Sequence, residues 1–115
     1  MLKKKNKVDK SLFVVVVKRG SGYFSQNASL KVLKTADNNC KFGISVSKKE
    51  LKKATDRNLL KRRVLSILKN IKPKISVKAG FGCVIFLKKG AIDIPYQKLQ
   101  DEIVFLLKKQ IGYSD

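Results

Sequence analysis

The chain has 115 residues, 43% of them hydrophobic, which is enough for one folded domain and excludes a purely disordered basic tail. Its 27 lysine and arginine residues against 8 acidic ones give a formal net charge of +19, which predicts a polyanionic partner, with nucleic acid first and an anionic membrane surface second. The chain has no histidine and its two cysteines form no CxxC pair, so a Cys/His zinc site is excluded and reduced thiols in a cytoplasmic protein are expected.

The N-terminal region begins with a basic segment that leads into a short apolar one. We expect residues 1–10, which are mostly polar and lysine-rich, to form a mobile arm of a single domain that spans residues 1–115. Residues 12–17 are apolar, but the run is too short for a signal peptide or a membrane span. Their β-branched content favours a strand, whereas their length and flanks permit a helix, so periodicity leaves both open.

Two segments of alternating polarity follow a glycine-containing break at residues 20–22. Residues 29–34 and 42–47 both read as strands, and the polar residues 37–39 between them indicate a turn. In the second strand the two faces differ clearly, with Phe42, Ile44 and Val46 inside and Gly43, Ser45 and Ser47 outside. This pattern predicts a hairpin whose outer face is small, polar and open to a ligand.

The second half of the chain predicts two helices around one strand. Residues 55–71 read as a helix with Thr55 as N-cap and Asp56 in the first turn. Its apolar residues repeat at helical spacing and predict a buried stripe of Leu60, Val64, Ile67, Leu68 and Ile71. Residues 80–87 indicate a central strand that buries Cys83, and residues 96–111 a last amphipathic helix with Leu99, Ile103, Leu106 and Leu107 inside. The order favours an α+β fold with helices packed on a small sheet.

The aromatic residues divide into two groups by their surroundings. Three lie in apolar patterns and are expected in the core, namely Phe42, Phe86 and Phe105. Three others flank the break at residues 20–22, where each either packs or stacks on an unpaired base, namely Phe13, Tyr23 and Phe24.

The basic residues concentrate before and within the helix expected at residues 55–71. At about 100° per residue, Asn58, Lys61 and Arg62 share a flank beside the apolar stripe, whereas Arg63 points roughly the other way. Arginine can contact a phosphate with two N–H groups, lysine supplies a mobile charge, and Asn58 can bond a base edge or a sugar hydroxyl. The charges have almost one sign, so the pattern favours a nucleic-acid surface over a solvated helix face.

Catalytic chemistry by the protein itself is not indicated. The acidic residues form no pair at a telling spacing, no histidine is present, and no glycine-rich phosphate loop is found. The sequence therefore predicts a binding protein with no catalytic residue, no metal ligand and no small-molecule substrate.

Two motifs resemble the signature of the bacterial ribonuclease P protein component. Residues 42–49 read FGISVSKK and residues 52–63 read KKATDRNLLKRR, which is similar to that family's GxSVSKK strand followed by its RNRxKRRxR helix. Residues 82–91 and Tyr96 resemble its final strand and the start of its last helix. The resemblance covers nearly the whole chain. It implies an αβββαβα order, a four-stranded sheet with a left-handed β-α-β crossover, and a helix over residues 10–19.

The resemblance also implies the function. In that family a catalytic RNA with bound Mg²⁺ ions removes the 5′ leader from precursor tRNA, and the protein is the non-catalytic subunit. The implied partners are ribonuclease P RNA and precursor tRNA. The residues expected to contact RNA are Lys48, Lys49, Lys53, Arg57, Asn58, Lys61, Arg62 and Arg63. Those expected along a cleft for the single-stranded leader are Phe13, Lys31, Ser45 and Ser47.

The chain departs from the family pattern at four positions. Leu59 and Leu65 stand where arginines are usual, and Val17 and Lys31 stand where aromatic residues are common. We expect weaker stacking on the leader and more weight on charge, with Arg63 and the lysines offsetting the missing arginines.

Two other functions are compatible with the composition. A generic RNA- or ribosome-binding protein explains the charge but not the spacing around Arg57 and Asn58. A membrane-surface protein would need an exposed amphipathic stripe, and both long helices are expected to use their apolar faces in the core.

Overall fold

The computed structural model describes residues 7–36, 39–75 and 80–110 of the protein. Within these ranges the elements are, in chain order, α1 (Lys10–Arg19), β1 (Ser21–Phe24), β2 (Ala28–Lys34), β3 (Cys40–Ser45), α2 (Ala54–Ile71), β4 (Phe81–Leu87) and α3 (Tyr96–Gln110). Short 3-10 helices at Lys72–Lys74 and Lys89–Ile92 follow α2 and β4. The αβββαβα order of one α+β domain is confirmed.

The strands form one sheet in the order β1-β2-β4-β3. The central strand β4 pairs antiparallel with β2 and parallel with β3, and α2 makes the crossover between the parallel pair. The expected hairpin between residues 29–34 and 42–47 is therefore wrong. Its strands are separated by β4, which is apolar throughout and almost wholly buried, and such a strand is best covered at the centre of a sheet.

The hairpin of this sheet lies one strand earlier in the chain. β1 pairs antiparallel with β2, with Tyr23 opposite Leu30 and Phe24 opposite Ser29. The glycines at residues 20–22 read as a break, but this segment also holds the start of β1. All four residues of β1 are exposed, so this edge strand lacks the apolar alternation that marks a half-buried strand.

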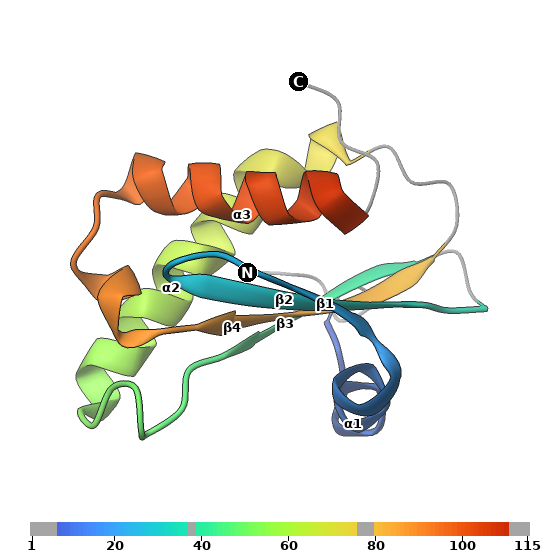
Figure 1. Ribbon diagram of the computed structural model, residues 1–115, viewed down its shortest axis with the longest axis horizontal. Coiled ribbons are helices and arrows are strands. Elements are labelled where there is room, and N and C mark those ends of the chain that lie inside the picture. Colours follow the sequence, from blue (N-terminus) through green and yellow to red (C-terminus); the bar gives the residue numbers. More distant parts are fainter. Residues whose placement is uncertain (1–6, 37–38, 76–79, 111–115) are drawn as a thin grey trace.

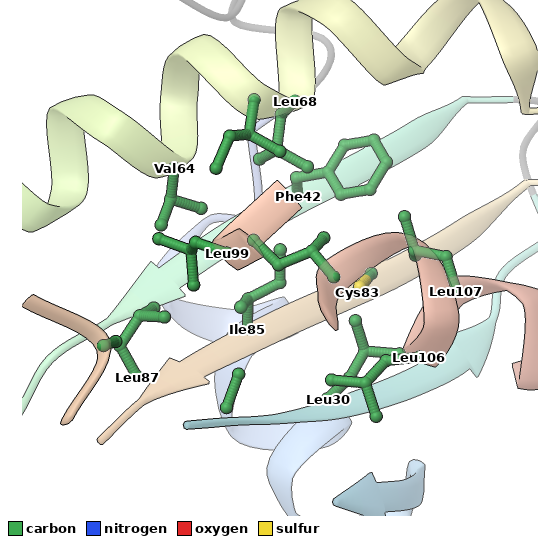
Figure 2. Close-up of a cluster of buried hydrophobic side chains, with 14 of the residues drawn as sticks. Leu30, Phe42, Val64, Leu68, Cys83, Ile85, Leu87, Leu99, Leu106 and Leu107 are labelled. Carbon is green, nitrogen blue, oxygen red and sulfur yellow. The ribbon is translucent and has the colours of Figure 1, made fainter. Parts of the chain in front are cut away.

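The two faces of the sheet are covered unequally (Figure 1). Helices α2 and α3 lie on one face, and the shorter α1 lies on the other. The core lies between the sheet and the α2–α3 layer, as Figure 2 shows for Leu30, Phe42, Val64, Leu68, Cys83, Ile85, Leu87, Leu99, Leu106 and Leu107. All the residues expected on the apolar stripes of the two long helices are buried, which confirms both helices and their orientation.

Helix α1 settles the ambiguity of residues 12–17 in favour of a helix. The Asp9 side chain caps its start by accepting a hydrogen bond from the backbone N–H of Leu12 at 2.8 Å. Val16 is buried against the sheet. Glycine is required at the helix end, because a Cβ at Gly20 would lie 2.5 Å from the carbonyl oxygen of Val16 and 3.1 Å from that of Val32.

The folded part of the chain starts before α1. The backbone N–H of Val8 donates to the carbonyl of Phe42 at 3.1 Å, and Lys7 forms a parallel bridge with the same residue. Residues 1–6, the rest of the expected mobile arm, lie outside the described residues.

Two local predictions are wrong. Thr55 is not the N-cap of α2, because the helix begins at Ala54 after Lys53, which makes no side-chain cap. Phe105 is not in the core: its side chain is 53% exposed, with the Lys109 ammonium 5.1 Å from the ring centroid. Helical geometry explains this, since Phe105 is two residues, about 200°, from the buried Ile103.

Candidate nucleic-acid interface

The segment between β3 and α2 carries the first cluster of predicted RNA-binding residues. It is held in place by the buried Val46 and Leu51, and by Glu50, whose carboxylate accepts from the backbone N–H of Lys89 at 3.0 Å. Lys48, Lys49 and Lys53 project from this segment and are exposed. A fixed backbone thus presents three mobile ammonium groups to solvent.

The first turns of α2 continue this positive surface. Asn58 and Arg62 are exposed, and Lys61 is half-buried beside the core stripe. Residues three and four apart are neighbours on a helix, so these three side chains lie together. We call the set Lys48, Lys49, Lys53, Asn58, Lys61 and Arg62 the α2 basic surface. Within the described residues, no hydrogen bond or ion pair is found for its side chains, so they are available to phosphates.

Two of the arginines predicted to contact RNA also form hydrogen bonds within the protein. The guanidinium of Arg57 donates through Nη1 to the carbonyls of Leu51 at 2.8 Å and Lys52 at 2.9 Å, which ties the loop to the helix start. The guanidinium of Arg63 donates to the carbonyl of Ile92 at 3.2 Å, on the side away from the α2 basic surface. The structure therefore gives both arginines a positioning role, and Arg57 keeps further N–H groups for a ligand.

A cleft opens between α1 and the sheet, with a volume of about 540 Å³. Its described lining comes from α1, from strands β2, β3 and β4, and from the segments that follow β3 and β4, namely Val17, Ser29, Lys31, Ser45, Ser47, Glu50, Phe86, Leu87 and Lys88. We call it the α1 cleft. It brings together three of the four residues expected along the leader, Lys31, Ser45 and Ser47.

The remaining residue, Phe13, lies beside the α1 cleft without lining it. Its ring centroid is 6.3 Å from that of Phe86, with the rings tilted by 58°. Lys31 is held within the cleft, because its ammonium donates to the carbonyl of Val17 at 2.7 Å, near the end of α1. The lysine thus sets a positive charge between the helix and the sheet.

Sequence reasoning missed Ser29, Phe86 and Lys88 as cleft residues. Phe86 was expected in the core because β4 reads as a continuous apolar run, yet it is half-buried and faces α1. Strand geometry could have indicated this, because successive side chains of a strand point to opposite faces. The odd-numbered residues of β4 face the core and its even-numbered residues face α1.

The positions that depart from the family pattern have different surroundings. Leu59 is 42% exposed on α2, whereas Leu65 is half-buried and packs against the core. Val17 and Lys31 both line the α1 cleft, so at these two positions the cleft lacks the aromatic side chains that are common in the family pattern.

The described residues show neither a metal site nor a reactive thiol at this interface. No group of three or more histidine, cysteine or acidic side chains lies together in the part of the chain that the structure describes. Cys83 is buried in the core, and burial raises the pKa of its thiol. Among the described helices, none has the length and apolarity needed to cross a membrane.

Comparison with known proteins connects this geometry to one family. The family model described as ribonuclease P matches residues 1–110. The ribonuclease P protein component of a Synechocystis species is 36% identical over 105 residues, which cover 90% of this chain and 82% of the relative. That of Microcystis aeruginosa is 41% identical over 69 residues, 60% of this chain and 56% of the relative.

Solved structures agree with the fold. The ribonuclease P protein from Thermotoga maritima has a TM-score of 0.76 and 27% identity, and the match covers 87% of this chain and 92% of that one. The Staphylococcus aureus protein has a TM-score of 0.79 at 22% identity, over 96% and 99% of the two chains, and supports the fold alone.

The fold, the α2 basic surface and the α1 cleft define a small, strongly basic protein of the α+β class with a surface suited to a polyanion. The family match then identifies which one: the chain belongs to the ribonuclease P family. It is the protein component of a ribonucleoprotein endoribonuclease that acts in tRNA processing.

Proposed function

We propose that this chain binds the catalytic RNA of ribonuclease P through the α2 basic surface and the 5′ leader of precursor tRNA in the α1 cleft. In this proposal it acts in the cytoplasm, and the cleavage chemistry belongs to the RNA and its Mg²⁺ ions. The protein contributes positioning and positive charge, which the lysines and the arginine of the α2 basic surface supply.

The continuity between the two surfaces carries the proposal. Ser47 and Glu50 line the α1 cleft, and Lys48 and Lys49 lie between them in the chain and are exposed. In this proposal a single strand in the cleft leads directly to the lysines of the segment before α2. The cleft offers the hydroxyls of three serines and the ammonium groups of Lys31 and Lys88, which suits a sugar-phosphate chain with unpaired bases.

The decisive experiment is cleavage of a precursor tRNA by a bacterial ribonuclease P RNA at low Mg²⁺, with and without the protein. Phosphate repulsion between catalyst and substrate is least screened under these conditions, so the protein is expected to restore cleavage. A protein that binds RNA tightly without promoting cleavage would point to the generic RNA-binding function.

Variants of the α2 basic surface sharpen this test. Lys61→Ala and Arg62→Ala should each weaken RNA binding and lower the slope of log affinity against log salt by about one unit or less. Lys98→Ala, which removes the same charge from an exposed position on α3, is the matched control and should leave the slope nearly unchanged. Equal losses of affinity in all three variants would mean that RNA binding depends on the net charge of the protein and not on the α2 basic surface.

A further inference from the structure

An exposed aromatic ring lies beside the α1 cleft on the edge strand. Phe24 is 74% exposed, more than any other large hydrophobic side chain among the described residues. The strand register pairs Phe24 with Ser29, Ser29 with Phe86, and Phe86 with Ser45. Directly paired residues share a face of a sheet, so Phe24 extends the row that forms the floor of the α1 cleft.

A lysine connects this ring to the cleft. The ammonium of Lys88 lies 5.9 Å from the ring centroid of Phe24, and Lys88 also lines the α1 cleft. The same ammonium donates to the carbonyl of Ser25 at 3.2 Å, which fixes it beside the ring. An aromatic face and a positive charge are thus held side by side at the cleft's outer end.

The turn that carries the pair is itself anchored. Asn27 is buried, its side-chain amide donates to Glu102 on α3 at 3.0 Å, and its carbonyl accepts from the backbone N–H of Lys88 at 3.0 Å. At Gly90 a Cβ would lie 2.5 Å from the Asn27 side-chain oxygen, so this fit depends on glycine. Because the backbone is fixed before any ligand arrives, little ordering is needed on binding.

We propose that Phe24 and Lys88 form a stacking subsite for one unpaired base of the precursor-tRNA leader, immediately outside the α1 cleft. The inference rests on the proposed function and extends it to a named base-binding position. The base covers the exposed ring, and Lys88 lies within reach of a neighbouring phosphate. Every base has a flat π-face, so the subsite binds a base without selecting its identity.

The test measures binding of precursor tRNA to the holoenzyme reconstituted with a bacterial ribonuclease P RNA. Phe24→Ala should weaken binding roughly tenfold when the leader is long enough to reach β1. Phe24→Trp should keep the affinity, and Phe24→Leu should lose most of it because the apolar bulk remains without the π-face. Mature tRNA, which has no leader, should bind all variants equally.

An abasic nucleotide distinguishes stacking from a backbone contact. One leader position should exist where removing the base weakens wild-type binding as much as Phe24→Ala does. Combining that leader with Phe24→Ala should add little further loss, because both changes remove the same contact. Fully additive losses at every position would overturn the proposal.

Two aromatic residues on the other side of the molecule serve as matched controls. Tyr23 neighbours Phe24 but pairs with Leu30, so it faces the α3 side, and Phe105 makes a similar pair with Lys109 on α3. Tyr23→Ala and Phe105→Ala should leave leader-dependent binding unchanged. If the leader adds nothing to wild-type affinity, the proposed function fails; if it does and Phe24→Ala has no effect, only this subsite fails.

Discussion

The two faces of the sheet use the same strands for different purposes. Toward α2 and α3 the strands present Leu30, Phe42, Cys83 and Ile85, all buried in the core. Toward α1 the paired row contains Ser29, Phe86 and Ser45, and only part of it is covered. One face is closed by two helices of 18 and 15 residues, and the other by a single helix of 10.

This difference shows how a small domain can hold both a core and a binding surface. Strand alternation assigns neighbouring residues of β4 to opposite faces, so Ile85 stabilises the fold while Phe86 lines the α1 cleft. Because α1 is short, it covers Gly82 with Leu12 and Val16, whereas Phe86, farther along β4 on the same face, is only half-buried. The comparison predicts that substitutions on the two faces have separable effects.

The largest expected effect comes from the core face. Ile85→Ala should lower the free energy of unfolding by about 2–5 kcal/mol, because it leaves a cavity between β4 and the helices. Ser45→Ala, one strand away on the α1 face, should change it by no more than about 0.5 kcal/mol. Urea denaturation of both variants measures the contrast. Similar losses in the two would contradict the division between the faces.

A smaller loss is expected where α1 contacts the sheet. In Gly82→Val the new side chain meets Leu12 and Val16, because even a Cβ would lie 3.1 Å from each. This overpacking should cost about 1–3 kcal/mol of unfolding free energy and move α1 from the sheet.

The matched control for this contact is Gly22→Ala on the same face of the sheet. The new Cβ would meet the nearest atom, Lys31 Cγ, at an ordinary 3.7 Å. Stability should stay the same or rise slightly, since alanine restricts the unfolded chain. Thermal unfolding together with leader binding separates the two glycines: Gly82→Val should weaken both, and Gly22→Ala neither.

The sequence predicted the two long helices better than the sheet, and the reason is physical. The stripes Leu60 to Ile71 and Leu99 to Leu107 follow a period of 3.6 residues, which is a local property of the chain. Strand pairing depends on distant residues: β2 lies beside β4, about fifty residues later in the chain, and no local pattern reports that choice. The expected hairpin failed for this reason.

The candidate site was predicted in outline through its family motif. Arg62 lies exposed on α2 beside the half-buried Lys61, and Lys31, Ser45 and Ser47 meet in one cleft. The engagement of Arg57 with two backbone carbonyls could not be predicted, because it depends on the path of the loop before α2. Phe24 was singled out as a residue that either packs or stacks on a base, but its contact with Lys88 could not be predicted, because it depends on the register of three strands.

The smallest effect, on thiol chemistry alone, tests how tightly the core face is closed. Cys83 is fully buried, and burial raises the pKa of its thiol, so the reactive thiolate is scarce at pH 8. Cys40, at the start of β3, is only half-buried. Iodoacetamide should therefore modify Cys83 at least roughly tenfold more slowly than Cys40 in the native protein, as mass spectrometry of timed samples would measure. In denaturant the two rates should converge, because the raised pKa belongs to the folded state. Rapid labelling of Cys83 in the native protein would mean that the α2–α3 layer opens readily. The two faces of the sheet would then differ less in solvent access than the contrast between them requires.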